Sequence, residues 1–546
     1  MSEHVSPLVA EDADARQLAT FGYRQELRRA LGLFENFAVA FCYLSPMVGI
    51  FSLFAVGIGS GGPRYLWLMP IAVLGQLFAA LIFAELGSSY PIAGALFQWG
   101  KQLIGPGYGW WVGWIYGWTL MITVAAVDTG VVIYGAPLLN SLFHTNINPA
   151  DPNTILLFTL IVVALQFIAN AAGVRILGFI SRYGVYVEIV GTFGLAIALA
   201  VTGFHHGGDY LFTTQGVENL KTNPLGVDFN GNWWLGAAFI AILAHVYIFY
   251  GFEAAGDVAE EVKDPRRRVP RAIISSLLVG GIASFVLVLA LILAIPSGSK
   301  AFASAASLSG GVPFIISSQF TSAALQNAIL GVILLAFFSC GTAVMAAAGR
   351  VAFSYGRDGS IPLSKSVARV SRRFRTPVYA LLLVSVIPVL FVLLAHVSPG
   401  NPVNILFFTY PASVTPLTLL ISFSVSGIYL SFLLIILASL IGRLRGWKPT
   451  GTFRLGGWTY PVIALALVWN VATLLNVLLP SGLTSPRGAL YNFDWLALLV
   501  IVLIVLIGAV YYLAARPQRH IRDRMAAGPL PTAPAPQATT GGVTRS

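Results

Sequence analysis

The chain has 546 residues, of which 57% are hydrophobic and only 10% are charged. A soluble domain carries about 25% charged residues, so a soluble fold of this composition would lack the polar surface needed to cover its core. The composition therefore excludes a large water-soluble protein and indicates a chain whose apolar side chains face lipid.

Apolar stretches long enough to cross a bilayer as helices recur throughout the chain. They predict an all-α integral membrane protein with about 12 transmembrane helices, since about 20 residues are needed for each crossing. The predicted spans cover residues 33–59, 66–88, 109–138, 154–173, 178–203, 234–257, 271–295, 327–353, 377–397, 414–442, 459–479 and 492–515. Residues 1–32 are expected to form a cytoplasmic N-terminal segment. Residues 516–546 are expected to form a cytoplasmic disordered tail, because the end of the chain is rich in Pro, Ala, Thr and Gly.

A net charge of +11 can indicate a nucleic-acid partner, so the positions of the basic residues matter. If the N-terminus lies inside and the chain crosses twelve times, 28 of the 32 Lys and Arg residues fall in inner segments. Only Arg64, Lys221, Lys300 and Arg487 fall outside. The positive-inside rule therefore supports an even span number with both termini in the cytoplasm, and it explains the basic charge without nucleic acid.

Two predicted spans carry helix breakers at their centres. In the first span Pro46 removes a backbone donor, and Gly49 lowers helicity further. In the sixth span Gly251 and Gly256 flank Glu253. A single break would suit a simple proline kink equally well. Two breaks about 205 residues apart, each opening a five-span block, favour an inverted repeat of the kind that binds solutes at broken helices.

Three acidic residues lie inside predicted spans: Asp128, Glu188 and Glu253. An acid at the bilayer centre costs roughly 2.5–3.5 kcal/mol, so such residues usually face a cavity or a partner. One interpretation is that one acid binds a cationic group of a substrate and another takes up a proton for coupling. The alternative is that a protonated acid only ties helices together. For Asp128 and Glu188 the two interpretations are equally supported. Glu253 lies at the break of the sixth span, and this position favours a binding role for it.

No pattern typical of an enzyme or of an ATP-driven pump occurs in the sequence. It contains no Gly-rich phosphate loop ending in Gly-Lys-Ser/Thr. Cys42 and Cys340 have no metal-ligand or redox spacing, and His245 has no nucleophile beside it in sequence. We therefore expect no enzymatic activity, no cofactor and no bound metal.

Four segments together resemble the amino acid–polyamine–organocation superfamily of permeases, in the branch that includes amino-acid, choline and GABA permeases. They are the first break at 43–51, the stretch 84–94 after the second span, the sixth span and its exit at 251–273, and the stretch 349–362. In the expected order, these segments span roughly residues 30–455.

The resemblance implies the leucine-transporter-like fold, in which two five-helix inverted repeats are followed by two further helices. The repeats would cover residues 33–203 and 234–442, and the last two helices residues 459–515. In such families the substrate carboxylate meets backbone N–H groups at the first break, and its ammonium group meets carbonyls at the sixth. The corresponding positions here are Ser45, Val48, Gly49, Ile50, Phe249, Tyr250, Phe252 and Glu253. Phe252 would form an aromatic lid over the substrate.

Two further charged residues, Glu85 and Arg350, lie near the predicted cytoplasmic ends of their spans. We expect Glu85 to lie within reach of Arg350 in the folded bundle and to act as an inner gate or a structural ion pair. The alternative is a solvated charge at a helix end.

These features predict a secondary transporter that carries an amino acid across the cytoplasmic membrane by alternating access. Protons, through Asp128 or Glu188, are the expected coupling ion, with Na⁺ as the alternative. One departure keeps other substrates open. Many relatives carry Gly-Ser-Gly-Ile-Phe at the first break, where this chain has Met-Val-Gly-Ile-Phe at residues 47–51. Because this chain has fewer small residues there, a substrate carboxylate has less room to approach the backbone. A choline, GABA or polyamine carrier of the same fold is therefore an alternative, and a nutrient sensor without net transport is another.

Overall fold

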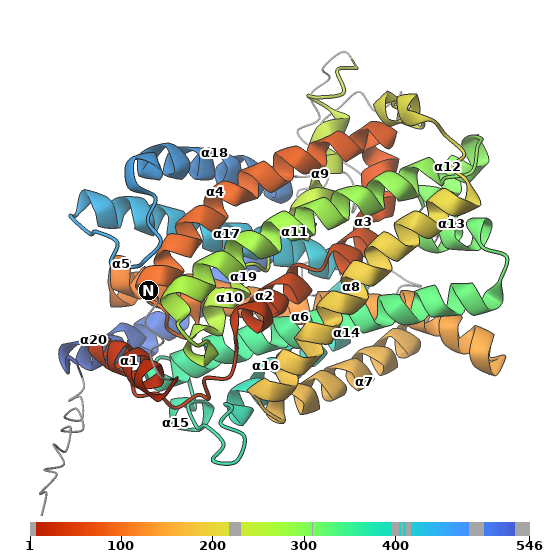
Figure 1. Cartoon of the computed structure of the whole chain (residues 1–546). Helices are drawn as coiled ribbons and strands as arrows, with labels where there is room; N and C mark the ends of the chain where they lie inside the picture. Colours follow the sequence, from red (N-terminus) through yellow and green to blue (C-terminus); the bar gives the residue numbers. More distant parts are fainter. Residues whose placement is uncertain are drawn as a thin grey trace, which may run out of the picture.

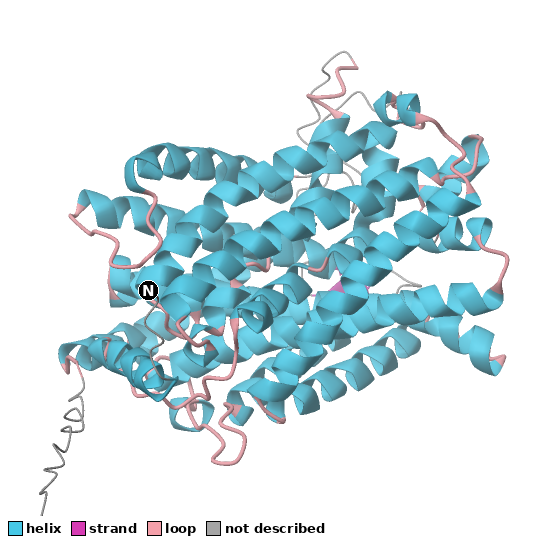
Figure 2. Ribbon diagram, viewed as in Figure 1, coloured by secondary structure: helices cyan, strands magenta, loops and turns pink. Residues whose placement is uncertain are grey.

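The structure is a computed structural model that describes residues 7–217, 231–307, 310–395, 403–405, 408–410, 416–479 and 496–529. Nearly all of this described chain is helical, as Figure 2 shows. The α-helices are α1 (Pro7–Thr20), α2 (Leu33–Leu44), α3 (Pro46–Gly61), α4 (Leu68–Ser89), α5 (Ala95–Leu103), α6 (Pro106–Phe143), α7 (Pro152–Ala171), α8 (Val174–Thr202), α9 (Ala237–Ile248), α10 (Ala254–Asp257), α11 (Pro265–Leu293), α12 (Ser299–Ala305), α13 (Gly311–Gln319), α14 (Ala323–Arg357), α15 (Ser364–Val367), α16 (Val378–Ala395), α17 (Pro416–Leu444), α18 (Thr459–Leu478), α19 (Leu496–Ala515) and α20 (Pro517–Ala526).

Six short elements complete the described chain. Four are short 3₁₀ helices, and two are strands that pair in antiparallel fashion. They are η1 (Pro63–Trp67), η2 (Gly208–Phe212), η3 (Ala259–Glu261), η4 (Gly456–Trp458), β1 (Val403–Ile405) and β2 (Phe408–Tyr410).

The predicted membrane architecture is confirmed. Ten helical segments of the described chain are long and apolar enough to cross a bilayer, and α2 with α3 counts as one of them. The shorter apolar helices α9 and α16 stand at the two remaining predicted spans. α9 is short because the sixth span is interrupted after Ile248 and becomes helical again only at Ala254.

The long helices run side by side between two ends of the bundle (Figure 1). One end holds α1 and α20, and we call it the α1 end; the other holds α12 and α13, and we call it the α12 end. α2 packs against α8, α11 and α14, and α3 packs against α9. Every residue from Phe41 to Ile50 is buried, so the first break lies deep inside the bundle.

One part of the predicted domain organisation is wrong. The segment 516–546 is expected from its composition to be disordered, but Pro517–Ala526 form α20. The physical reason is tertiary contact: Ile521 is fully buried, α20 packs against α6, and Arg524 pairs with Asp358 at 3.5 Å. Residues 530–546 lie outside the described residues, and the repeat boundaries 33–203 and 234–442 stay predictions.

Candidate functional site

The first break is a single residue wide. Ser45 separates α2 from α3 and has φ 38°, in the left-handed region that non-glycine residues avoid. Pro46 suits the start of α3 because the first helical position needs no N–H. The N–H of Val48 donates to Ser45 Oγ at 3.2 Å, and the N–H of Gly49 donates to the Ser45 carbonyl at 3.1 Å. Ser45 therefore accepts the hydrogen bonds of two backbone N–H groups at the start of α3.

The sixth break is wider and lies between α9 and α10. Gly251 has φ 105°, which only glycine adopts easily. Side chains from other helices satisfy the carbonyls that the break frees, as membrane depth requires. Gln76 of α4 donates to the Phe249 carbonyl at 2.9 Å, and the Tyr429 hydroxyl donates to the Val246 carbonyl at 3.2 Å.

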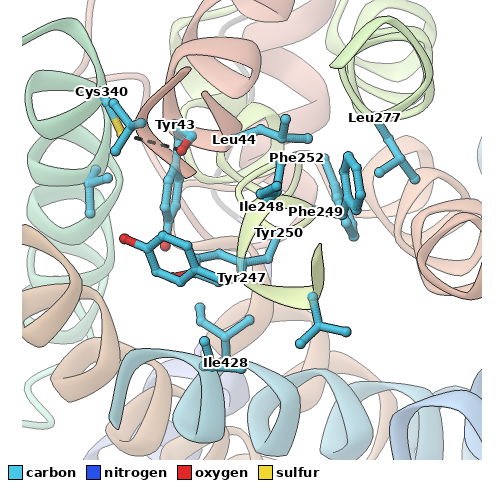
Figure 3. Close-up of a cluster of buried hydrophobic side chains, with 14 of the residues drawn as sticks. Tyr43, Leu44, Tyr247, Ile248, Phe249, Tyr250, Phe252, Leu277, Cys340 and Ile428 are labelled. Atoms are coloured by element: carbon cyan, nitrogen blue, oxygen red, sulfur yellow. Dashed lines mark hydrogen bonds between the residues drawn. The ribbon is translucent and has the colours of Figure 1, made fainter. Parts of the chain in front are cut away.

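The two breaks touch each other. A Cβ on Gly251 would lie 2.7 Å from the backbone nitrogen of Leu44, and a Cβ on Gly49 would lie 2.6 Å from Cγ1 of Ile248. Figure 3 shows Leu44 and Ile248 beside each other, with the sixth-break residues around them. The structure thus brings together all of the predicted substrate-binding positions, and every one of them is buried: Ser45, Val48, Gly49, Ile50, Phe249, Tyr250, Phe252 and Glu253.

Aromatic rings line both sides of this contact. Tyr250 packs edge-on against Tyr43, with ring centroids 5.9 Å apart, and against Tyr247 at 5.7 Å. Phe252 lies on the other side of the break from Tyr43 (Figure 3), where it packs against Phe432 at 5.5 Å. The role of Phe252 as a lid stays a prediction, and the tyrosine cluster is a feature that the sequence did not single out.

Two carboxylates at the sixth break are each only half satisfied. Glu253 Oε2 accepts from the N–H of Gly251 at 2.8 Å, whereas its Oε1 has no hydrogen-bond partner. Asp257 Oδ2 accepts from the Tyr116 hydroxyl at 2.6 Å, whereas its Oδ1 has none. Both side chains are fully buried. They therefore offer two carboxyl oxygens, which have no partner within the described residues, to a group that can donate hydrogen bonds.

The predicted coupling residues lie in different surroundings. Glu188 of α8 accepts from the Ser45 hydroxyl at 2.9 Å, so it is tied to the first break. Asp128 of α6 accepts from Gln166 of α7 at 2.7 Å. Each has a second oxygen without a partner. Cys340 lies within electrostatic reach of both acids, and its thiol points at the Tyr43 carbonyl, 3.4 Å away (Figure 3).

These four buried acids share one property. Within the described ranges, no Lys, Arg or His lies within 4.0 Å of Asp128, Glu188, Glu253 or Asp257, and all seven ion pairs use other acids. A buried charge is normally paired. The centre of the bundle therefore carries carboxyl groups that take part in no ion pair of the described residues.

The expected pairing of Glu85 with Arg350 is wrong. Glu85 forms an ion pair with Arg443 of α17 and also accepts from the N–H of Leu455 at 2.9 Å. Arg350 pairs instead with Glu261, with a nitrogen-to-oxygen distance of 3.0 Å. Both arginines lie toward the carboxyl ends of apolar helices, and the packing of those helices decides which one meets Glu85.

Sequence reasoning missed a charged network at the α1 end. Arg357 pairs with Glu260 at 2.7 Å, and Lys101 pairs with Asp358 at 2.7 Å, beside the hydroxyl of Tyr23. Three of these residues, Glu260, Arg357 and Asp358, lie within segments that carry the family resemblance, and that resemblance was the available signal. Burial acts to lower the pKa of Lys101, but Asp358 and Tyr23 together outweigh it, so the pKa lies above the ordinary value and the ammonium group stays charged.

The two ends of the bundle are closed by different chemistry. All seven ion pairs of the described chain lie on segments that meet at the α1 end. Toward the α12 end, Trp67 stacks on Phe212 at 5.2 Å and Tyr65 stacks on His245 at 5.0 Å. His245 Nε2 also lies 3.0 Å from the Tyr65 carbonyl, which supports a structural role for this histidine.

The chain is similar to known permeases over most of its length. The family described as "Amino acid permease" matches residues 31–515. An amino-acid permease BAT1 homolog of Oryza sativa subsp. japonica is 24% identical over 85% of this chain and 87% of its own length. The GABA-specific permease of Saccharomyces cerevisiae is 26% identical over 68% of this chain and 64% of its own. A putative polyamine transporter of Candida albicans is 26% identical over 85% of this chain and 81% of its own.

Proposed function

Because the chain belongs to the amino acid permease family, we propose that it is a proton-coupled secondary transporter of a small solute that carries an ammonium group. Family membership makes the chain a multi-pass membrane transporter rather than an enzyme. The solute class is that of the relatives: an amino acid or a related amine.

The observation that carries this proposal is the contact between the two breaks beside uncompensated carboxylates. A buried polar group without a partner costs about 1–3 kcal/mol, and more when it is charged. An ammonium group that donates to Glu253 Oε1 or to Asp257 Oδ1 would satisfy a buried oxygen that has no partner within the described residues. Binding at broken helices near the bilayer midplane also suits alternating access, because both half-helices can move around one site.

Proton coupling needs an acid that can gain and lose its charge within the bundle. Asp128 and Glu188 both qualify, since each is buried, lacks a cationic partner and has one free oxygen. Neither is part of the sixth break, so a proton on either acid leaves the proposed ammonium site in place.

We assign the protein to the cytoplasmic membrane, with the α1 end in the cytoplasm. The positive-inside distribution of Lys and Arg supports this orientation. An even number of spans also requires that α1 and α20 lie at the same end, as they do (Figure 1).

The experiment is uptake by reconstituted vesicles under an imposed pH gradient. We expect labelled solute to accumulate when the outside is more acidic, and a protonophore should abolish the accumulation. A parallel Na⁺ gradient at equal pH tests the other coupling ion. If no amino acid or amine accumulates under any gradient, the proposal is wrong.

Glu253→Gln tests the site itself. It keeps the shape of the side chain but removes the charge, so kcat/KM should fall at least tenfold, equivalent to about 1.4 kcal/mol. Glu26→Gln makes the same chemical change at an exposed position and should leave uptake unchanged. Wild-type kinetics in Glu253→Gln would remove Glu253 from the site.

A further inference from the structure

The start of α3 is occupied by a carboxylate of the chain itself. The amino end of a helix carries partial positive charge and free N–H groups, which together attract anions. Here Glu188 reaches this position from α8. It accepts from the Ser45 hydroxyl at 2.9 Å, and its carboxylate lies against the N–H of Met47.

The N–H groups in the first turn of α3 lie near acceptor groups of the chain itself. Pro46 has none, and Met47 faces Glu188. The N–H groups of the next two residues both donate to Ser45, at 3.2 Å to its hydroxyl oxygen and at 3.1 Å to its carbonyl oxygen. A solute carboxylate at this break would have to displace Glu188 or Ser45.

The surroundings favour a cation rather than a zwitterion. Glu188, Glu253 and Asp257 are fully buried, and none has a cationic partner within the described residues. Tyr43 and Tyr250 present their rings on the Cys340 side of the breaks (Figure 3). Aromatic faces bind organic ammonium groups by cation–π attraction. The site therefore offers three carboxyl groups and aromatic rings, and its unpartnered donor on this side is the Tyr43 hydroxyl rather than an N–H group of α3.

We propose that Glu188 is the resident anion of the first break, so that the site selects organic amines without a carboxylate over the corresponding α-amino acids. Glu188 is then a specificity-determining residue, and Asp128 is left as the acid for proton coupling. This inference rests on the proposed function, because it concerns the substrate class of the same site.

The test compares each α-amino acid with its own decarboxylation product. Suitable pairs are arginine with agmatine, lysine with cadaverine, histidine with histamine, and tyrosine with tyramine. Their members differ only in the carboxylate, so the difference in affinity isolates its contribution. Affinity is measured by thermal stabilisation of the purified full chain, since a ligand that binds the folded state raises its melting temperature. Transport is measured by competition in vesicles.

We expect the amine to bind at least tenfold more tightly than its amino acid in every pair that binds. Tighter binding of the amino acids would overturn the inference while leaving the proposed transporter intact. If no member of any pair binds or is transported, the proposed function fails and the inference fails with it. This comparison uses the wild-type chain, so it does not depend on how any variant folds.

Two variants then test the role of Glu188. Glu188→Gln removes the resident charge, so it should reduce the preference for the amine over the amino acid at least tenfold. Thr192→Val is the matched control. It lies one turn further along α8, it is equally buried, and its hydroxyl has no partner. The control should keep the wild-type preference. An unchanged preference in a folded Glu188→Gln protein would overturn the assignment.

Discussion

Gly251→Ala is the sharpest perturbation of the contact between the two breaks. The added methyl group would lie 2.7 Å from the backbone nitrogen of Leu44 and 2.9 Å from the carbonyl carbon of Tyr43. These are backbone atoms, so no side-chain rotation relieves the overlap. The glycine also has φ 105°, which an alanine adopts only with strain.

The size of the effect follows from these two contributions. A left-handed conformation costs an L-residue roughly 1–2 kcal/mol, and overpacking a tight interior costs about 1–3 kcal/mol. We therefore expect the substitution to lower the free energy of unfolding by about 2–5 kcal/mol. If the two breaks separate to relieve the overlap, the predicted substrate positions separate with them, and the uptake rate falls as well.

Thermal unfolding of the purified protein and initial uptake rates in vesicles measure the two effects. Gly194→Ala is the control, because a Cβ at this position in α8 meets no atom within 4 Å. In a helix this change is expected to be neutral or to stabilise by up to about 1 kcal/mol. Wild-type melting and transport in Gly251→Ala would show that the two breaks are not packed this tightly.

Three further predictions concern charges and caps. Arg350→Met leaves Glu261 buried and unpaired, so it should destabilise by about 3–5 kcal/mol. The double variant Arg350→Met with Glu261→Gln should recover most of that loss in thermal unfolding. If the single and the double variant melt at the same temperature, the buried ion pair is contradicted. Ser45→Ala removes the cap of α3 and should cost about 1 kcal/mol in the same assay; no loss would show that the cap contributes nothing. The pKa of Lys101 is raised above its ordinary value of 10.5. The stabilisation from its pairing with Asp358 is therefore fully present below pH 10.5 and is lost only as the pH rises above that value. Lys101→Met should therefore lower the melting temperature by the same amount at pH 7 and pH 9, and a smaller difference at pH 9 would contradict the assignment.

The sequence was sufficient to predict the helical spans and the positions of both breaks. Hydropathy and the positive-inside rule depend only on composition along the chain, and Pro46 and Gly251 act on their own helices. The family resemblance supplied the predicted binding positions, and the contact of Gly251 with Leu44 brings these positions together. Local chemistry and pattern were enough for these features.

Contacts between distant helices could not be predicted in the same way. Glu188 lies 143 residues after Ser45, and nothing in either segment indicates that they meet. Arg350 and Arg443 were equally plausible partners for Glu85, because both stand near the ends of apolar helices. The helix α20 was missed since its stability comes from burial of Ile521 rather than from its own composition.

The contrast between the ion-paired α1 end and the aromatic α12 end has a consequence for heat capacity. Opening the α12 end exposes apolar surface to water, which raises the heat capacity, whereas exposing polar groups lowers it. Separating the ion pairs at the α1 end also returns charges to water, and the hydration of charges becomes less favourable on warming. We therefore expect the two half-cycles of transport to differ in heat-capacity change, so that the balance between the two open states of the carrier shifts with temperature.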